Sequence, residues 1–199
     1  MEKSALIDSD VNYDWNFLNY PIHTVSAKPE QTSKECAILL IHGFGASTDH
    51  WRFNIPILSN KYEVHAMDLL GFGKSPKPQD VEYSGSLWKD QVVAYVKEKI
   101  KKPTIVVGNS LGGYAALAAG SELNELNAGV ILLNAAGYFS EEKTIKKNML
   151  QTSIETVAGI FLKNVVLQRL IFENMRNPKN IKKTLNQVYV DKKNVDDFL

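Results

Sequence analysis

Short apolar runs and amphipathic stretches alternate along residues 1–137 of the chain. In ECAILLIHG, every position from 36 to 41 is apolar, which is typical of a strand buried on both faces of a sheet. Similar short runs, bounded by glycine, proline or polar residues, predict further strands. The predicted strands lie at 20–27, 36–41, 62–67, 104–107 and 129–134.

Amphipathic stretches between these runs predict helices. From residue 86 onward, apolar residues recur at the spacing of one helix face. These residues are Trp88, Val92, Tyr95, Val96 and Ile100. A second helix is predicted from Ser47 or Thr48 to about residue 58, shortened or kinked by Pro56, and a third at 111–123. The alternation favours an α/β fold, with a mostly parallel sheet and helices on both faces.

The chain changes character after residue 137. Residues 141–199 contain no comparable strand pattern, and the segments 154–172 and 181–199 predict helices. This part carries eleven Lys and Arg against seven Asp and Glu, which is typical of a solvated helical surface. We therefore predict a sheet-forming part at 1–140 and an appended helical part at 141–199.

Composition and charge narrow the range of partners and compartments. The chain is 44% hydrophobic and 23% charged, with a formal net charge of +1, so no strong field indicates a nucleic-acid partner. The single cysteine, Cys36, is expected to be buried and fits a reducing compartment such as the cytoplasm. No apolar run is long enough for a transmembrane segment. Composition leaves the oligomeric state open.

The stretch IVVGNSLGGY contains the motif most suggestive of chemistry. Gly108, Asn109, Ser110, Leu111 and Gly112 match G-x-S-x-G, with a predicted strand before the motif and a predicted helix after it. A sharp strand-to-helix turn forces its serine into an unfavourable conformation and presents the hydroxyl outward. The alternative interpretation is a glycine-rich turn with a capping serine.

A second glycine loop, IHGFG, follows the buried run at 36–41. Acyl transfer needs two N–H donors for the oxyanion of its tetrahedral intermediate, and these can come from two separate loops. The candidate donors are the backbone amides of Phe44 and Leu111. The residues expected to support the two loops are His42, Gly43, Gly45, Gly108, Asn109, Gly112 and Gly113.

Three sequence blocks, IHGFGAS, MDLLGFGKSPKP and VVGNSLGGYAALAAG, resemble the α/β-hydrolase family in order and spacing. They cover residues 36–137. The resemblance implies that Ser110 is the nucleophile, that Phe44 and Leu111 provide the oxyanion hole, and that the segment after 140 belongs to a helical cap. It also implies an esterase-like enzyme that uses no metal and no organic cofactor on a small, largely apolar ester.

The resemblance extends to two kinds of hydrolase. GNSLGGY and YSGSLWKDQVVAYV are similar to pheophytinase-like hydrolases, which cleave a phytyl ester and imply a plastid location as the alternative to the cytoplasm. GNS also resembles ring-cleavage-product hydrolases, which break carbon–carbon bonds. Ester hydrolysis is the first hypothesis and carbon–carbon hydrolysis its alternative.

The usual base and acid of a serine triad are missing from their expected positions. In this family the acid and then the histidine follow the serine in the chain. All histidines precede Ser110: they are His23, His42, His50 and His65. Glu141 and Glu142 follow the last predicted strand, but they are more simply explained as the start of a helix.

We therefore expect the sequence to cover about the N-terminal two-thirds of an enzyme, without its last strands. By itself it should hydrolyse poorly or not at all, as an inactive fragment, since a serine hydroxyl needs an adjacent base. A non-catalytic protein that keeps the pocket to bind a ligand is the remaining alternative.

Overall fold

The computed structural model describes residues 11–12, 15–29, 36–136, 169, 173–174 and 176–188. The chain divides into two compact units, Met1–Phe139 and Ser140–Leu199, and each is described by itself. Within the described residues, every helix is too short or too polar to cross a membrane.

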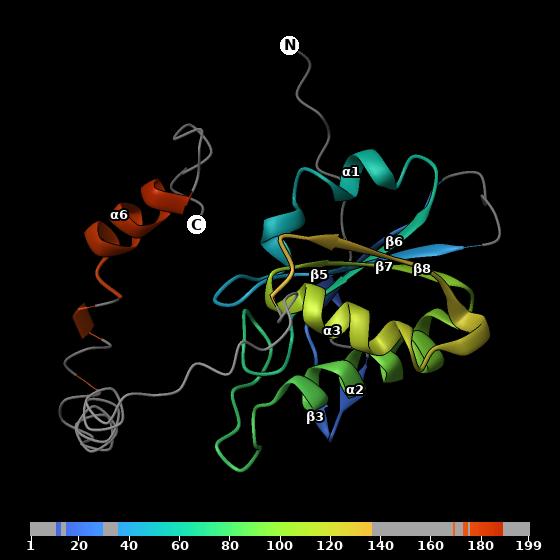
Figure 1. The fold of residues 1–199 in the computed structure, drawn as a ribbon, viewed down its shortest axis with the longest axis horizontal. Helices are drawn as coiled ribbons and strands as arrows, with labels where there is room; N and C mark the ends of the chain where they lie inside the picture. Colours follow the sequence, from blue (N-terminus) through green and yellow to red (C-terminus); the bar gives the residue numbers. More distant parts are fainter. Residues whose placement is uncertain are drawn as a thin grey trace, which may run out of the picture. The chain divides into compact units, whose positions relative to one another are not determined.

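A six-stranded sheet forms the centre of the first unit, in the order β1-β4-β6-β5-β7-β8 (Figure 1). Strands β5, β6, β7 and β8 run parallel, whereas β4 is antiparallel to β6 and β1 is antiparallel to β4. The strands are β1 (Val11–Asn12), β4 (Thr24–Ala27), β5 (Ala37–Ile41), β6 (Glu63–Met67), β7 (Thr104–Asn109) and β8 (Asn127–Leu133). A separate hairpin pairs β2 (Asn16–Phe17) with β3 (Tyr20–Pro21).

The prediction of a mostly parallel α/β sheet is confirmed. The prediction of a strand buried on both faces is also confirmed, because all five residues of β5 are buried. Its side chains alternate between two cores: Leu39 and Ile41 belong to one cluster, and Ile38 and Leu40 to the other. Each face of the sheet therefore needs its own cover of helices.

Helices cover the two faces unequally. On one face lie α2 (Gly85–Tyr95), which continues into one turn of π-helix, η2 (Val96–Ile100), and α3 (Leu111–Gly120) (Figure 1). On the other face lie the 3₁₀ turn η1 (Thr48–Trp51) and the short α1 (Ile55–Leu58). A further 3₁₀ turn, η3 (Asn124–Leu126), leads into β8. Helices on both faces of a mostly parallel sheet define the α/β class.

Three local predictions need correction. The helix predicted from 47 to 58 is two separate elements, η1 and α1, because Pro56 occupies the first turn of a new helix rather than the end of an old one. The strand predicted at 20–27 is split between β3 and β4. Cys36 is only half-buried, since it precedes the first residue of β5 rather than lying within the strand.

The second unit is described at few positions. Helix α6 (Pro178–Val188) overlaps the helix predicted at 181–199. Of the helix predicted at 154–172, only Arg169 is described, and it is helical. The rest of that prediction lies outside the described residues.

Candidate active site

Ser110 lies at the sharp turn between β7 and α3, in a strained backbone conformation. Its φ of 50° and ψ of −115° lie outside the regions that residues with a side chain ordinarily adopt. Such a conformation costs about 1–3 kcal/mol and persists only where its surroundings hold it. A turn that merely capped the helix would not need this strain, and the Ser110 side chain makes no capping hydrogen bond to α3.

Hydrogen bonds to both neighbouring elements hold this turn. The Ser110 amide donates to the Leu133 carbonyl at 3.0 Å, and the Ser110 carbonyl accepts from the amides of Gly113 and Ala136, each at 2.9 Å. The Asn109 side-chain amide also donates to the Leu133 carbonyl, at 3.4 Å. The end of β8 therefore fixes the serine backbone as much as α3 does.

Glycine is required where the turn packs against its neighbours. A Cβ on Gly108 would lie 2.1 Å from the Gly112 carbonyl oxygen, and one on Gly112 would lie 2.4 Å from that of His42. A Cβ on Gly113 would lie 2.5 Å from the Ala135 Cβ. Because Cβ atoms do not approach other atoms this closely, these positions exclude every larger residue.

The second glycine loop lies directly against the serine turn. A Cβ on Gly43 would be 3.2 Å from the Ser110 Cβ and 2.9 Å from the Asn109 Oδ1. Neither the Phe44 amide nor the Leu111 amide has a hydrogen-bond acceptor among the described residues. Two N–H groups, one on each loop, thus remain available beside the Ser110 turn.

His42 braces the loop and has both ring nitrogens engaged. The Leu69 amide donates to its Nε2 at 3.1 Å, so Nε2 is the acceptor and Nδ1 carries the proton that it donates to the Gly43 carbonyl at 2.7 Å. Burial holds the pKa of His42 below its ordinary value, which keeps the ring neutral. The geometry therefore uses this side chain to position Gly43, not to accept a proton from Ser110.

Comparison with known proteins agrees with this geometry. A family model described as the alpha/beta hydrolase fold matches residues 37–175, which include both glycine loops and the serine turn. The chain belongs to the α/β-hydrolase family. Its second unit begins within the matched range, at Ser140.

Several relatives of this α/β hydrolase are known enzymes. It is 29% identical over 188 residues to the chloroplastic pheophytinase of Arabidopsis thaliana, covering 78% of this chain and 39% of that protein. It is 37% identical over 119 residues to the 2-hydroxy-6-oxo-6-(2'-aminophenyl)hexa-2,4-dienoic acid hydrolase of Metapseudomonas resinovorans, covering 56% of this chain and 39% of that one. The chain thus spans about two-fifths of the length of each.

Solved structures show the same fold. A membrane phospholipase A, described as a bacterial virulence factor, superposes with a TM-score of 0.63 at 28% identity. The superposition covers 85% of this chain and 48% of that one. The prediction of an α/β-hydrolase fold is confirmed.

Asp68, at the end of β6, ties η1, which follows the Gly43 loop of this hydrolase, to the loop that follows β6. It is fully buried and accepts hydrogen bonds from the Thr48 amide at 2.6 Å and the Lys74 amide at 2.7 Å. His23 Nδ1 lies 3.0 Å from its Oδ2. Burial alone would raise the pKa of Asp68, but the hydrogen bonds from His23 and the two amides keep that pKa below its ordinary value. The sequence gives no sign that His23 is the partner.

The other histidines have structural contacts of their own. The His65 ring lies between the Tyr95 hydroxyl and the Glu63 carboxylate, each at 3.1 Å. The His50 ring packs on Trp51 with 5.2 Å between the ring centroids. These contacts are with the sheet, α2 and η1, rather than with the Ser110 turn.

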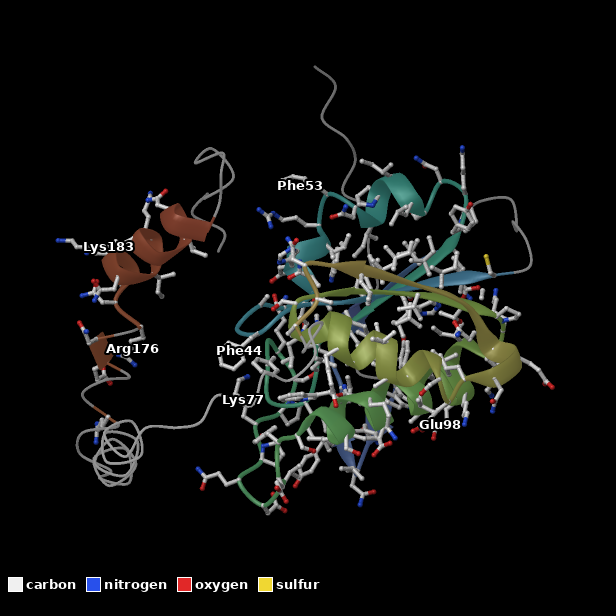
Figure 2. All side chains as sticks on the ribbon, in the orientation of Figure 1. Phe44, Phe53, Lys77, Glu98, Arg176 and Lys183 are labelled. Carbon is white, nitrogen blue, oxygen red and sulfur yellow. The ribbon has the colours of Figure 1, made fainter. Side chains whose placement is uncertain are left out.

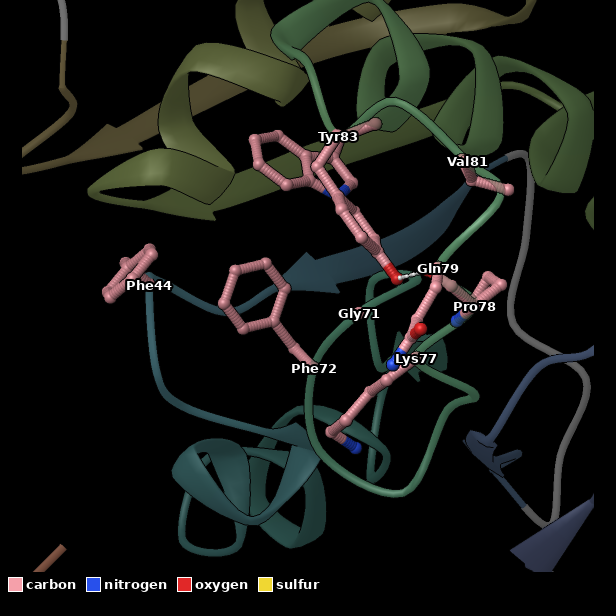
Figure 3. Close-up of a pocket in the computed structure, with 9 residues that line it drawn as sticks. Phe44, Gly71, Phe72, Lys77, Pro78, Gln79, Val81 and Tyr83 are labelled. Carbon is pink, nitrogen blue, oxygen red and sulfur yellow. Dashed lines mark hydrogen bonds between the residues drawn. The ribbon is translucent and has the colours of Figure 1, made fainter. Parts of the chain in front are cut away.

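An apolar pocket of about 540 Å³ opens beside Phe44. It extends from the Gly43 loop along the segment between β6 and α2 (Figure 3). Phe44 projects outward from this end of the sheet, and its side chain is 79% exposed (Figure 2). Sequence reasoning missed this pocket: Phe44 and Phe72 lie in the glycine-rich blocks and Trp88 lies on a periodic helix face, but no pattern along the chain shows that they surround one cavity.

Proposed function

We propose that the chain carries the nucleophile and oxyanion hole of a serine hydrolase that cleaves carboxylic esters. The observation that supports the proposal best is the strained backbone of Ser110, held against a loop whose Phe44 amide has no acceptor among the described residues. Membership of a family that includes esterases and lipases among its relatives points the same way.

In the proposed reaction, the Ser110 hydroxyl attacks the ester carbonyl carbon and loses its proton to a general base. The Phe44 and Leu111 amides donate to the oxyanion, and the N-terminus of α3 adds a favourable dipole. The tetrahedral intermediate then expels the alcohol, which takes up a proton, and leaves an acyl group on Ser110. Water hydrolyses this acyl-enzyme to the carboxylic acid.

The general base is not assigned to any of the four histidines. His42 has both nitrogens engaged, and His23, His50 and His65 contact groups away from the Ser110 turn. We therefore expect the 199-residue chain by itself to show only the weak catalysis of an oxyanion hole with an unactivated serine, about 10³–10⁴-fold over water.

Carbon–carbon bond hydrolysis is the second candidate. Two relatives named for such substrates, at 37% and 34% identity, support it. Comparing p-nitrophenyl esters with a 2-hydroxy-6-oxohexa-2,4-dienoic acid as substrates distinguishes the two. Faster turnover of the dienoic acid would make carbon–carbon bond hydrolysis the first candidate function and ester hydrolysis the second.

The nucleophile is tested with a fluorophosphonate probe on the 199-residue chain and on the longest product of its reading frame. We expect labelling of the longest product that Ser110→Ala abolishes and that Ser86→Ala, at an exposed serine, leaves intact. Labelling that survives Ser110→Ala would refute the assignment.

A cytoplasmic location is also proposed, supported by the single cysteine. A relative of this chain is named chloroplastic, so a plastid is the alternative. Microscopy of the tagged protein in its own cell distinguishes the two.

A further inference from the structure

The walls of the 540 Å³ pocket present mostly carbon, although several of their side chains are amphipathic and Gln79 carries a polar amide. The Tyr83 hydroxyl donates to the Pro78 carbonyl at 2.7 Å, and the Trp88 Nε1 donates to the Leu70 carbonyl at 3.0 Å. The Lys77 ammonium donates to the carbonyls of Gly73 and Ser75, so only its methylene stem faces the pocket. A polar ligand group would find few hydrogen-bond partners there. A hydrocarbon chain has no hydrogen bonds to lose when it leaves water for the pocket.

The pocket is formed before any ligand enters. The Tyr83 ring lies against Gly71, where a Cβ would be only 2.5 Å from the ring. The Phe72 ring packs at 5.6 Å from Trp88 and at 5.4 Å from Phe44, between ring centroids. Aromatic side chains held by such contacts and by backbone hydrogen bonds lose little entropy on binding. The pocket volume is within the range that holds small-molecule ligands.

Two routes connect the pocket to the serine turn. Phe44 lines the pocket, and its neighbour Gly43 lies against Ser110. Tyr114 is one turn beyond Ser110 on α3, and its ring lies against Gly85, at the start of the helix that carries Trp88. A group bound in the pocket would therefore extend from an ester held at Ser110.

We propose that this pocket binds the alkyl chain of the ester substrate, so that Val81, Tyr83 and Trp88 select long hydrocarbon chains over short ones. The inference rests on the proposed function, since it assigns a substrate class to the same site. Figure 3 shows Val81 and Tyr83 on the segment that leads into α2, and neither residue belongs to the Ser110 turn between β7 and α3.

Binding without reaction gives the first test. Tryptophan fluorescence of the 199-residue chain is titrated with 1-decanol and with 1-butanol. We expect a saturable change with decanol at least tenfold tighter than with butanol, because burial of two methylene groups already corresponds to about a tenfold gain. The change should disappear in Trp88→Phe and persist in Ser110→Ala. Equal responses to the two alcohols, or a decanol response that survives Trp88→Phe, would overturn the proposal.

Selectivity in reaction gives the second test. The rates at which ethyl and decyl fluorophosphonates label the longest product of the reading frame are compared. We expect a decyl preference of at least about tenfold. Val81→Asp, which places a charge in the pocket, should remove this preference, while Ile57→Asp, at an exposed residue of α1, should leave both rates unchanged.

The two tests separate the proposals. Decanol binding without labelling would refute the nucleophile and keep the pocket. Labelling without a chain-length preference would refute the pocket and keep the nucleophile. If Val81→Asp keeps the decyl preference of the wild type, the residues that select the chain length lie elsewhere. That result would overturn the assignment of this pocket as the alkyl-chain site.

Discussion

The two faces of the central sheet differ in how completely the described residues cover them. The face under α2 and α3 has a large buried cluster, to which Leu39 and Ile41 of β5 contribute with no exposed surface. The face under η1 and α1 has a smaller cluster around Trp51. There, an apolar groove of about 330 Å³ is lined by residues that include Ile131 and Leu133 of β8.

The serine turn depends on both faces. Helix α3 follows Ser110 on the well-covered face, yet the Leu133 carbonyl that accepts from the Ser110 amide lies at the end of β8. Among the described strands β8 is the last in the sheet, and the side chains of Ile131, Leu132 and Leu133 are 38–47% exposed. The difference teaches that a strained backbone conformation can be held by backbone hydrogen bonds even where side-chain burial is poor.

The largest effect is expected at the serine turn, where both faces meet. Gly112→Ala should lower the free energy of unfolding by about 3 kcal/mol or more, because the new Cβ would press on the carbonyl oxygens of Ile41 and His42. Gly45→Ala is the matched control: its Cβ would meet nothing, and only its φ of 71° would cost about 1–2 kcal/mol. Urea unfolding measures both. Equal losses of unfolding free energy in the two variants would show that close packing around Gly112 is not what excludes a larger residue from the turn.

The next effect compares the faces directly. Leu39→Ala should cost about 3 kcal/mol, since it leaves a cavity in the fully buried cluster. Leu133→Ala should cost less than about 1 kcal/mol, because its side chain is already 40% exposed. The two urea midpoints check this. A loss at Leu133 as large as that at Leu39 would mean that the face under α1 is covered in solution.

An acid-sensitive network supports the well-covered face. Glu63 on β6 contacts His65, which binds Tyr95 of α2, and it pairs with Lys102. Burial alone would raise the pKa of Glu63, but the hydrogen bonds from Lys102 and His65 lower it from 4.5 to about 2. A lowered folded-state pKa contributes stability above pH 4.5 that is lost as the pH falls toward 2.

Glu63→Gln tests this network. The wild-type chain should lose about 1–2 kcal/mol more between pH 5 and pH 3 than the variant loses, as measured by urea unfolding at each pH. Asp80→Asn, at an exposed carboxylate, is the control and should follow the wild type. If the free energy of unfolding falls in parallel with pH for the wild type and Glu63→Gln, the network does not contribute the acid-sensitive stability assigned to it.

The smallest effect on stability is expected on the less-covered face. Ile131→Lys should change the free energy of unfolding by less than about 0.5 kcal/mol, because Ile131 is 47% exposed. It should nevertheless slow aggregation, since a charge on an exposed apolar strand opposes edge pairing. Light scattering over time measures this, with Ile131→Val as the uncharged control. Equal aggregation of all three chains would show that β8 is not the contact surface.

The sequence by itself determined the features that depend on neighbours along the chain. The apolar run of β5 predicted a strand buried on both faces, and glycines on each side of Ser110 predicted a close turn between strand and helix. The family resemblance followed from the same local blocks. These features are local because backbone geometry and side-chain alternation act over a few residues.

Only the tertiary structure decided which distant groups meet. It paired Asp68 with His23, fixed the proton of His42 on Nδ1 through the Leu69 amide, and assembled the pocket beside Phe44. No spacing in the chain predicts these contacts, because each joins residues on separate elements that the sheet order brings together. The physical reason is that hydrogen bonds and packing depend on distance in space, whereas sequence patterns report only distance along the chain.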